Sequence, residues 1–224
     1  MKPEIILALD VDSFDKARNI VNELYPVIKT FKVGSQLFTA CGPKVIDAIN
    51  KKGASVFLDL KFFDIPNTVA HAVRNATRCK VKMMTLHILG DEEMIKAAVS
   101  AAGDEAKKLK IKKPMLIGVT VLTSKEAKSS DVLTLARMGI ECGLDGVVCS
   151  ALEVRMLREE LNKKFVIVTP GIRSKGGLVN DQKRTATVSE AVKAGSNFLV
   201  VGRPILESKD RRAAAREMSG EIVK

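Results

Sequence analysis

Short runs of aliphatic and β-branched residues recur along the chain, roughly every 25 to 30 residues. The runs are "IILALDV" from Ile5, "FKVG" from Phe31, "SVFLDL" from Ser55, "KMMTLH" from Lys82, "MLIGVTVL" from Met115, "DGVVCS" from Asp145, "FVIVTPG" from Phe165 and "FLVVG" from Phe198. Most are continuously apolar rather than alternating, which is typical of parallel strands buried on both faces. The pattern predicts eight parallel strands covered by helices.

The segments between these runs have apolar residues at helical spacing. Ser13 is a candidate N-cap, Pro66 suits a first helical turn, and Gly143 and Gly195 stand where C′ glycines end helices. The helical stripes are Phe14, Ala17, Ile20, Val21, Leu24, Val27 and Ile28; then Val69, Ala72, Val73 and Ala76; then Ile95, Ala98, Val99, Ala102, Ala106 and Leu109. We therefore expect an α/β protein, a (β/α)8 TIM barrel that forms a single domain over residues 1–224.

A Rossmann sheet is the competing architecture for alternating strands and helices. Its dinucleotide fingerprint, G-x-G-x-x-G, would follow the first strand. The sequence "LALDVDSFDKA" has acidic residues where the glycines would be. A bound dinucleotide is therefore not expected.

The net charge of +11 raises the possibility of nucleic-acid binding, as an alternative to an enzyme. The one dense cluster, "KKLKIKK" at 107–113, has no aromatic residues for base stacking and follows a helical pattern as a solvated segment would, so we expect no nucleic-acid partner. No apolar run approaches the roughly 20 residues of a membrane span, and "MKPEIILALDVD" is not a signal peptide, which favours a cytoplasmic protein. The spacing of Cys41, Cys79, Cys142 and Cys149 fits neither a zinc site nor a disulfide framework and predicts buried thiols.

In a barrel of this type, the carboxyl ends of the strands form the active face. Polar residues at those ends are Asp10, Lys32, Asp59, Lys61, His87, Thr120, Thr123, Ser150, Pro170 to Arg173, Gly202 and Arg203. Simpler roles are open for some of them. Asp10 or Asp12 could cap the first helix, Asp64 could cap the helix at Pro66, and a lone His87 is more often a core histidine.

Two groups of these residues indicate chemistry. Lys32, Asp59 and Lys61 would point from adjacent strand ends to the same opening of the barrel. Partly buried charges are tolerated there only when they are paired, so we expect a Lys-Asp-Lys-Asp network. The segments "TPGIRSKGG" and "VVGRPI" place Arg173 and Arg203 after the last two strands, the usual phosphate site of this fold. A small phosphorylated substrate is the expected ligand.

The motif "FLDLKFFDIPNT" resembles the D-x-K-x-x-D signature of the orotidine 5′-monophosphate decarboxylase family. The segments "ALD", "FKVG", "DGVVCS", "VTPGIR", "NDQKR" and "VVGRPI" match that family in order across nearly the whole chain. The resemblance implies a TIM barrel that converts orotidine 5′-monophosphate to uridine 5′-monophosphate and CO2, the last step of de novo pyrimidine synthesis. It also implies a homodimer that needs no metal and no organic cofactor.

The resemblance assigns roles to the matching positions. Lys61 is implied to be the proton donor, Asp59 the carboxylate beside the departing CO2, and Lys32 the group that orients the array and touches ribose. Asp64 and Thr68 are implied to enter the neighbouring subunit's site. The other implied substrate contacts are Asp10 at ribose, Thr123 and Pro170 at the base, and Arg173, Gln182, Gly202 and Arg203 at phosphate, with the loop from Arg173 to Asp181 as a lid.

Two departures from the family pattern stand near this motif. Phe63 occupies a position where many relatives have histidine, and "HILGD" lacks the usual pair of glycines after His87. Within the wider group that shares the signature, sugar-phosphate decarboxylases of the 3-keto-gulonate 6-phosphate type use a metal and are the enzymatic alternative. They would be expected to have an acidic metal ligand on the second strand, where this chain has Lys32.

Overall fold

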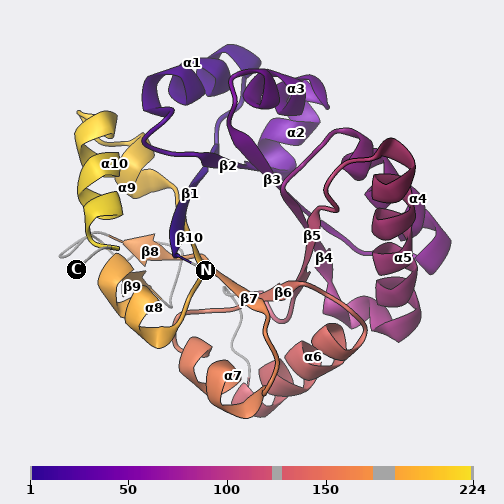
Figure 1. Cartoon of the computed structure of the whole chain (residues 1–224). Helices are drawn as coiled ribbons and strands as arrows, with labels where there is room; N and C mark the ends of the chain where they lie inside the picture. Colours follow the sequence, from indigo (N-terminus) through magenta and orange to yellow (C-terminus); the bar gives the residue numbers. More distant parts are fainter. Residues whose placement is uncertain (1, 123–127, 174–184, 223–224) are drawn as a thin grey trace.

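The structure, a computed structural model, describes residues 2–122, 128–173 and 185–222. Within these ranges, eight parallel strands close into a barrel in the order β1-β10-β7-β6-β5-β4-β3-β2, with helices around the outside (Figure 1). The strands are β1 (Glu4–Ala8), β2 (Thr30–Gly34), β3 (Ser55–Phe62), β4 (Met83–His87), β5 (Met115–Val119), β6 (Gly146–Val148), β7 (Val166–Thr169) and β10 (Phe198–Val201). The predicted TIM barrel and its eight strands are confirmed.

The outer layer alternates with these strands along the chain. Its elements are α1 (Phe14–Leu24), α2 (Ser35–Cys41), α3 (Lys44–Lys51), α4 (Pro66–Arg78), the short 3-10 helix η1 (Ile88–Gly90), α5 (Asp91–Leu109), α6 (Ser129–Glu141), α7 (Val154–Glu160), α8 (Val188–Ala194), α9 (Arg203–Leu206) and α10 (Arg211–Gly220). A two-stranded parallel sheet, β8 (Ile172–Arg173) with β9 (Ala186–Thr187), was not predicted.

The first helix shows which local signals fixed the helix ends. The Ser13 side chain accepts a hydrogen bond from the Lys16 backbone N–H at 3.4 Å, as predicted for an N-cap. The helix ends at Leu24 because the residue before Pro26 is pushed out of the helical region, and Tyr25 is extended with φ −72° and ψ 136°. The predicted stripe was therefore too long: Val27 and Ile28 lie beyond the helix, although both still pack on the core.

The core has two parts. A large cluster lies between strands and helices, and a smaller one fills the barrel interior with Ile6, Ala8, Phe57, Met83, Ile117, Val168, Phe198 and Val200. At the amino ends of the strands, the Lys82 ammonium group contacts the Glu4 carboxylate at 2.8 Å, the Thr30 hydroxyl at 2.9 Å and the face of Phe198. Side chains thus fill the barrel interior toward the amino ends of the strands, and space remains toward their carboxyl ends.

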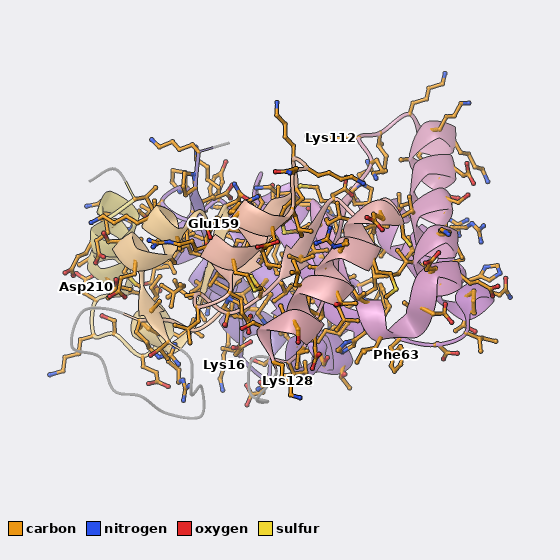
Figure 2. All side chains as sticks on the ribbon, turned by 90° about the horizontal axis from the view of Figure 1, so that it is seen from below. Lys16, Phe63, Lys112, Lys128, Glu159 and Asp210 are labelled. Atoms are coloured by element: carbon orange, nitrogen blue, oxygen red, sulfur yellow. The ribbon has the colours of Figure 1, made fainter. Side chains whose placement is uncertain are left out.

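A side view separates the two ends of the barrel. Figure 2 shows Phe63 and Lys128 at one end and Lys112 at the other. Phe63 follows β3 and Lys112 precedes β5, so the first of these ends contains the carboxyl ends of the strands. This is the end where the sequence predicts the chemistry.

Candidate active site

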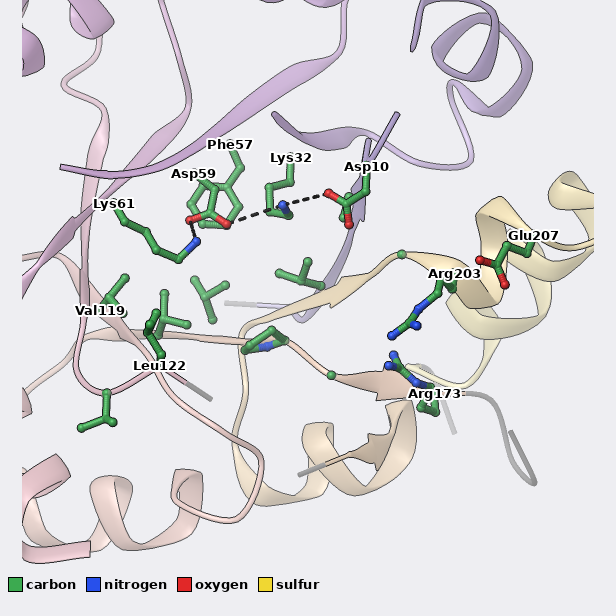
Figure 3. A pocket seen from close by; sticks show the side chains of 18 residues that line it. Asp10, Lys32, Phe57, Asp59, Lys61, Val119, Leu122, Arg173, Arg203 and Glu207 are labelled. Atoms are coloured by element: carbon green, nitrogen blue, oxygen red, sulfur yellow. Dashed lines mark hydrogen bonds and ion pairs between the residues drawn. The ribbon is translucent and has the colours of Figure 1, made fainter. Parts of the chain in front are cut away.

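A cavity of about 530 Å³ opens at the carboxyl ends of the strands (Figure 3). Its size lies in the range of roughly 300 to 1,000 Å³ that is usual for small-molecule sites. Its charged lining is Asp10, Lys32, Asp59, Lys61, Arg173, Arg203 and Glu207; the rest is Ala8, Phe57, Val119, Val121, Leu122, Val148, Val168, Pro170, Gly171, Val200 and Gly202. Charged groups therefore stand over an apolar floor, where electrostatic interactions are stronger than in water.

Strand β3 supplies the centre of the site. Phe57, Asp59 and Lys61 alternate along it and all line the cavity, as side chains at every second strand position do. The β3–β4 register shifts between Leu58 and Phe62. Lys61 has a positive φ of 51°, which re-aims its side chain at the end of the strand.

Four charged side chains form a continuous array along one wall of the cavity (Figure 3). The Lys61 Nζ lies 2.9 Å from the Asp59 Oδ1, and the Lys32 Nζ lies 3.5 Å from the Asp59 Oδ2 and 3.3 Å from the Asp10 Oδ1. The side chains of Lys32 and Asp59 are each 13% exposed, whereas that of Asp10 is 55% exposed. Opposite charges thus alternate from Lys61 through Asp59 and Lys32 to Asp10. Asp10 was not expected in this network, and Asp64, its expected second carboxylate, is not among the cavity residues.

Burial and charge act on Asp59 in opposite directions. Burial alone would raise its pKa, but the attraction of Lys32 and Lys61 and the hydrogen bonds from Lys61 and Thr85 outweigh it, so the pKa lies below 3.8. Asp59 is therefore ionised at neutral pH. Burial, together with the nearby Lys61 ammonium group, lowers the pKa of His87 below 6.5, so this imidazole is neutral at pH 7.

The two arginines lie beyond this array. Arg203 begins α9 directly after β10 and Gly202, and Arg173 is in β8 after the turn at Gly171. Gly171 has φ +80°, a conformation that favours glycine. Both arginines line the cavity, as Figure 3 shows. Two guanidinium groups in one cavity are suited to binding the oxygens of a phosphate.

The structure brings together eight of the predicted site residues in this one cavity: Asp10, Lys32, Asp59, Lys61, Pro170, Arg173, Gly202 and Arg203. Asp64 and Thr68 lie outside it and are exposed, Asp64 just before α4 and Thr68 in its first turn. The Asp64 Oδ1 accepts a hydrogen bond from the Ile65 N–H at 2.7 Å. Thr123, Gln182 and positions 174–181 of the predicted lid lie outside the described residues.

Other candidates from the strand ends have structural surroundings. The Thr120 hydroxyl donates to the Val148 carbonyl at 3.1 Å. Ser150 is buried, and its backbone N–H donates to the Glu153 carboxylate at 2.8 Å. The His87 ring packs against Phe63 with ring centroids 5.7 Å apart. None of these three polar candidates lines the cavity.

Sequence reasoning missed several residues in and around the site, among them one acidic, one apolar and one hydroxyl side chain. Glu207 and Leu122 line the cavity, and Thr85 bonds to the array from behind. Glu207 stands four positions after Arg203, a spacing that places both on one helical face. Thr85 carried no signal, because a threonine inside a buried strand is ordinary.

In the described ranges, no group of three or more His, Cys, Asp or Glu side chains could hold a metal ion. Cys142 and Cys149 are buried as predicted, whereas Cys41 and Cys79 are only partly buried. None of the helices in the described part of the chain has the length and apolarity of a membrane span.

Comparison with known families decides the relationship. The model of the orotidine 5′-phosphate decarboxylase / HUMPS family matches residues 3–218. The chain belongs to this family. A protein named orotidine 5′-phosphate decarboxylase from Syntrophomonas wolfei is 44% identical to the chain, and the match covers 97% of each of the two. A protein of the same name from Carboxydothermus hydrogenoformans is 45% identical, and the match covers 99% of this chain and 97% of that one.

A solved structure agrees with this family assignment. The crystal structure of orotidine 5′-phosphate decarboxylase from Lactobacillus acidophilus superposes with a TM-score of 0.88 at 34% identity. It covers 99% of this chain, and this chain covers 100% of that one. The family relationship therefore extends over the whole barrel and not only over the β3 motif.

Proposed function

We propose that the chain is a single-domain, cytosolic decarboxylase that converts orotidine 5′-monophosphate to uridine 5′-monophosphate and CO2, as the last step of de novo pyrimidine synthesis, without metal or organic cofactor. The observation that carries the proposal is the Lys61–Asp59–Lys32–Asp10 array in the same cavity as two arginines. The names of the relatives support the choice of substrate.

The two charged parts of the cavity suggest how the nucleotide lies. Its phosphate would contact Arg203, Arg173 and the Gly202 backbone, together with Gln182. Its ribose hydroxyls would contact Asp10 and Lys32, and its base would contact Pro170 and Thr123. The carboxylate of the pyrimidine would then face Lys61 and Asp59 above the apolar floor.

The Lys61 ammonium group addresses the difficult step of the reaction. Loss of CO2 from C6 leaves an electron pair in the plane of the ring, where the π system cannot delocalise it. A cation about 4 Å away, at an effective dielectric of about 20, stabilises that pair by roughly 4 kcal/mol, or about three powers of ten in rate. The same ammonium group then delivers a proton to C6.

Asp59 and Lys32 keep this ammonium group in place. Asp59 bonds Lys61 at 2.9 Å and is itself held by Lys32 at 3.5 Å, so the cation is fixed before the substrate arrives. The ionised Asp59 would also repel the substrate carboxylate, and this repulsion is relieved when neutral CO2 forms. Binding energy from the remote phosphate offsets that repulsion.

We propose a homodimer in which Asp64 and Thr68 enter the neighbouring subunit's site. Support comes from the exposed apolar surface next to them: Phe63 is 60% exposed, Ile65 66% and Leu89 59%. Apolar side chains exposed this close together are typical of an interface between subunits.

Subunit mixing tests this arrangement. Asp64→Ala and Lys61→Ala homodimers should each be inactive. Mixed at equal amounts with subunit exchange, they should regain roughly a quarter of wild-type activity, because half the dimers then contain one intact site. Absence of any recovery, with exchange verified by mass spectrometry, would contradict the shared site.

The proposed reaction is tested by incubating the purified protein with orotidine 5′-monophosphate in excess chelator. The absorbance should shift to that of uridine 5′-monophosphate without added metal. Turnover only after metal addition, or of a 3-keto sugar phosphate instead, would favour the metal-dependent alternative.

The phosphate assignment has its own variant. Arg203→Ala should raise KM about 10- to 100-fold, because a charge-assisted hydrogen bond contributes roughly 1.5 to 3 kcal/mol. The control is Arg18→Ala, which removes an exposed arginine of α1 and should leave KM unchanged. Unchanged KM and kcat/KM in Arg203→Ala would refute the assignment.

A further inference from the structure

The β3–β4 ladder is interrupted where the array begins. Leu58 pairs with Met84 and Phe62 pairs with Leu86, so the three residues 59–61 of β3 face one residue of β4, Thr85. Such a bulge breaks the regular backbone hydrogen bonds and leaves polar groups that need other partners.

The Thr85 side chain is the partner of one such backbone group, the Lys61 N–H. Its Oγ1 accepts a hydrogen bond from the Lys61 backbone N–H at 2.9 Å and lies 3.0 Å from the Asp59 Oδ1. A threonine hydroxyl has one proton. Because the Lys61 N–H already donates to this oxygen and the ionised Asp59 can only accept, the hydroxyl proton must go to Asp59.

Thr85 thus connects the backbone of Lys61 to the carboxylate of Asp59. Thr85 is 0% exposed, so it is held firmly by its surroundings. It supports the backbone of Lys61 at its left-handed φ of 51°, and it fixes the carboxylate that holds the Lys61 ammonium group at 2.9 Å. Burial raises the pKa of Asp59, and the two lysines lower it. The hydrogen bond from Thr85 lowers it further, as the smallest of these effects.

We infer that Thr85 is a positioning residue: its hydroxyl sets the Lys61–Asp59 geometry without lining the cavity or touching substrate. The inference rests on the proposed function for its kinetic consequences. A displacement of about 1 Å at a reacting group can cost a factor of roughly 100 in rate, so loss of the hydroxyl should act on kcat.

Three variants of Thr85 separate positioning from packing. Thr85→Val keeps the shape and removes the hydroxyl, and it should lower kcat about 10- to 100-fold with KM and the Kd of uridine 5′-monophosphate within about threefold. Thr85→Ser keeps the hydroxyl and should return kcat to within about threefold of wild type. Thr85→Ala is the second hydroxyl-free variant if Thr85→Val does not fold.

Thr77→Val is the matched control, because it removes another buried threonine hydroxyl, one that donates to the Val73 carbonyl inside α4. It should leave kcat unchanged. A folded Thr85→Val or Thr85→Ala with more than half of the wild-type kcat would overturn the inference, as would a Thr85→Ser as impaired as the hydroxyl-free variant.

A crystal structure of the hydroxyl-free variant decides the inference independently of activity. We expect the Lys61 φ or the 2.9 Å Lys61–Asp59 contact to change. If both persist, Thr85 does not position the array. If the wild-type protein fails to decarboxylate orotidine 5′-monophosphate, the proposed function falls, yet this structural comparison still stands.

Discussion

Replacing Asp59 by Asn tests the electrostatics of the array in a measurable way. The substitution keeps the shape of the side chain and removes its charge between the ammonium groups of Lys61 at 2.9 Å and Lys32 at 3.5 Å. At an effective dielectric of about 20, these attractions amount to about 6 and about 5 kcal/mol. Desolvation of the carboxylate offsets much of this, so we expect the free energy of unfolding to fall by about 3 to 5 kcal/mol at pH 7.

Urea and thermal unfolding measure this loss, and the chain contains a matched control. Asp12 forms an ion pair with Lys16 at the same distance, 2.9 Å, but with the two side chains 67% and 64% exposed. Asp12→Asn should leave the unfolding midpoint unchanged, because solvent screens an exposed pair. Equal midpoints for Asp59→Asn and wild type would refute the view that Asp59 is an essential counter-ion.

The same pair of proteins predicts a pH dependence. The pKa of Asp59 in the folded state lies below its ordinary value of 3.8, so its charge contributes stability above pH 3.8 and loses that contribution as the pH falls further. The stability difference between wild type and Asp59→Asn should be constant from about pH 7 to 5 and shrink below about pH 4. A difference that stays constant to about pH 2 would contradict the assigned pKa shift.

Two further substitutions test local geometry. Asp91 has φ 64° and ψ −179°, a conformation that favours glycine, while its side chain accepts the Met94 N–H at 3.1 Å. Asp91→Gly should therefore have a free energy of unfolding in urea within about 1 kcal/mol of wild type. Asp91→Ala should lower this free energy by about 1 to 2 kcal/mol, because it loses the hydrogen bond and keeps the strained backbone. An Asp91→Ala variant more stable than Asp91→Gly would contradict the strain. A Cβ at Gly34 would lie 3.0 Å from the Lys32 Nζ, so Gly34→Ala should lower kcat/KM for orotidine 5′-monophosphate about threefold without changing the unfolding midpoint. Gly103→Ala, with no atom within 4 Å of the added Cβ, is its control. Equal kcat/KM for the two variants would show that the space beside Gly34 does not matter for Lys32.

The fold followed from the sequence because its signals are local and repeated. Continuous apolar runs predicted every barrel strand, and the Ser13 cap and the Gly195 helix end, with φ +109°, were correct. The predicted first helix was too long because an apolar stripe does not register the conformational effect of Pro26. The two-residue strands β8 and β9 were missed because so short a pair has no periodicity.

The site was predictable only in part. The rule that active residues follow parallel strands selected Lys32, Asp59 and Lys61, and the structure places them in contact. The rule gave no distances, so it did not identify Asp10 as an ion-pair partner of Lys32. It also missed Thr85, because its role depends on a bulge in the neighbouring strand, and a bulge is a property of register rather than of composition.

The role of Lys61 is tested most directly by comparing wild type with Lys61→Ala on two readouts, turnover of orotidine 5′-monophosphate and affinity for uridine 5′-monophosphate. We expect kcat to fall by at least about 1,000-fold, because both the fixed cation and the proton donor are removed, and product affinity to stay within about fivefold of wild type. Turnover within about tenfold of wild type in Lys61→Ala would contradict the claim that a preorganised ammonium group stabilises the C6 carbanion.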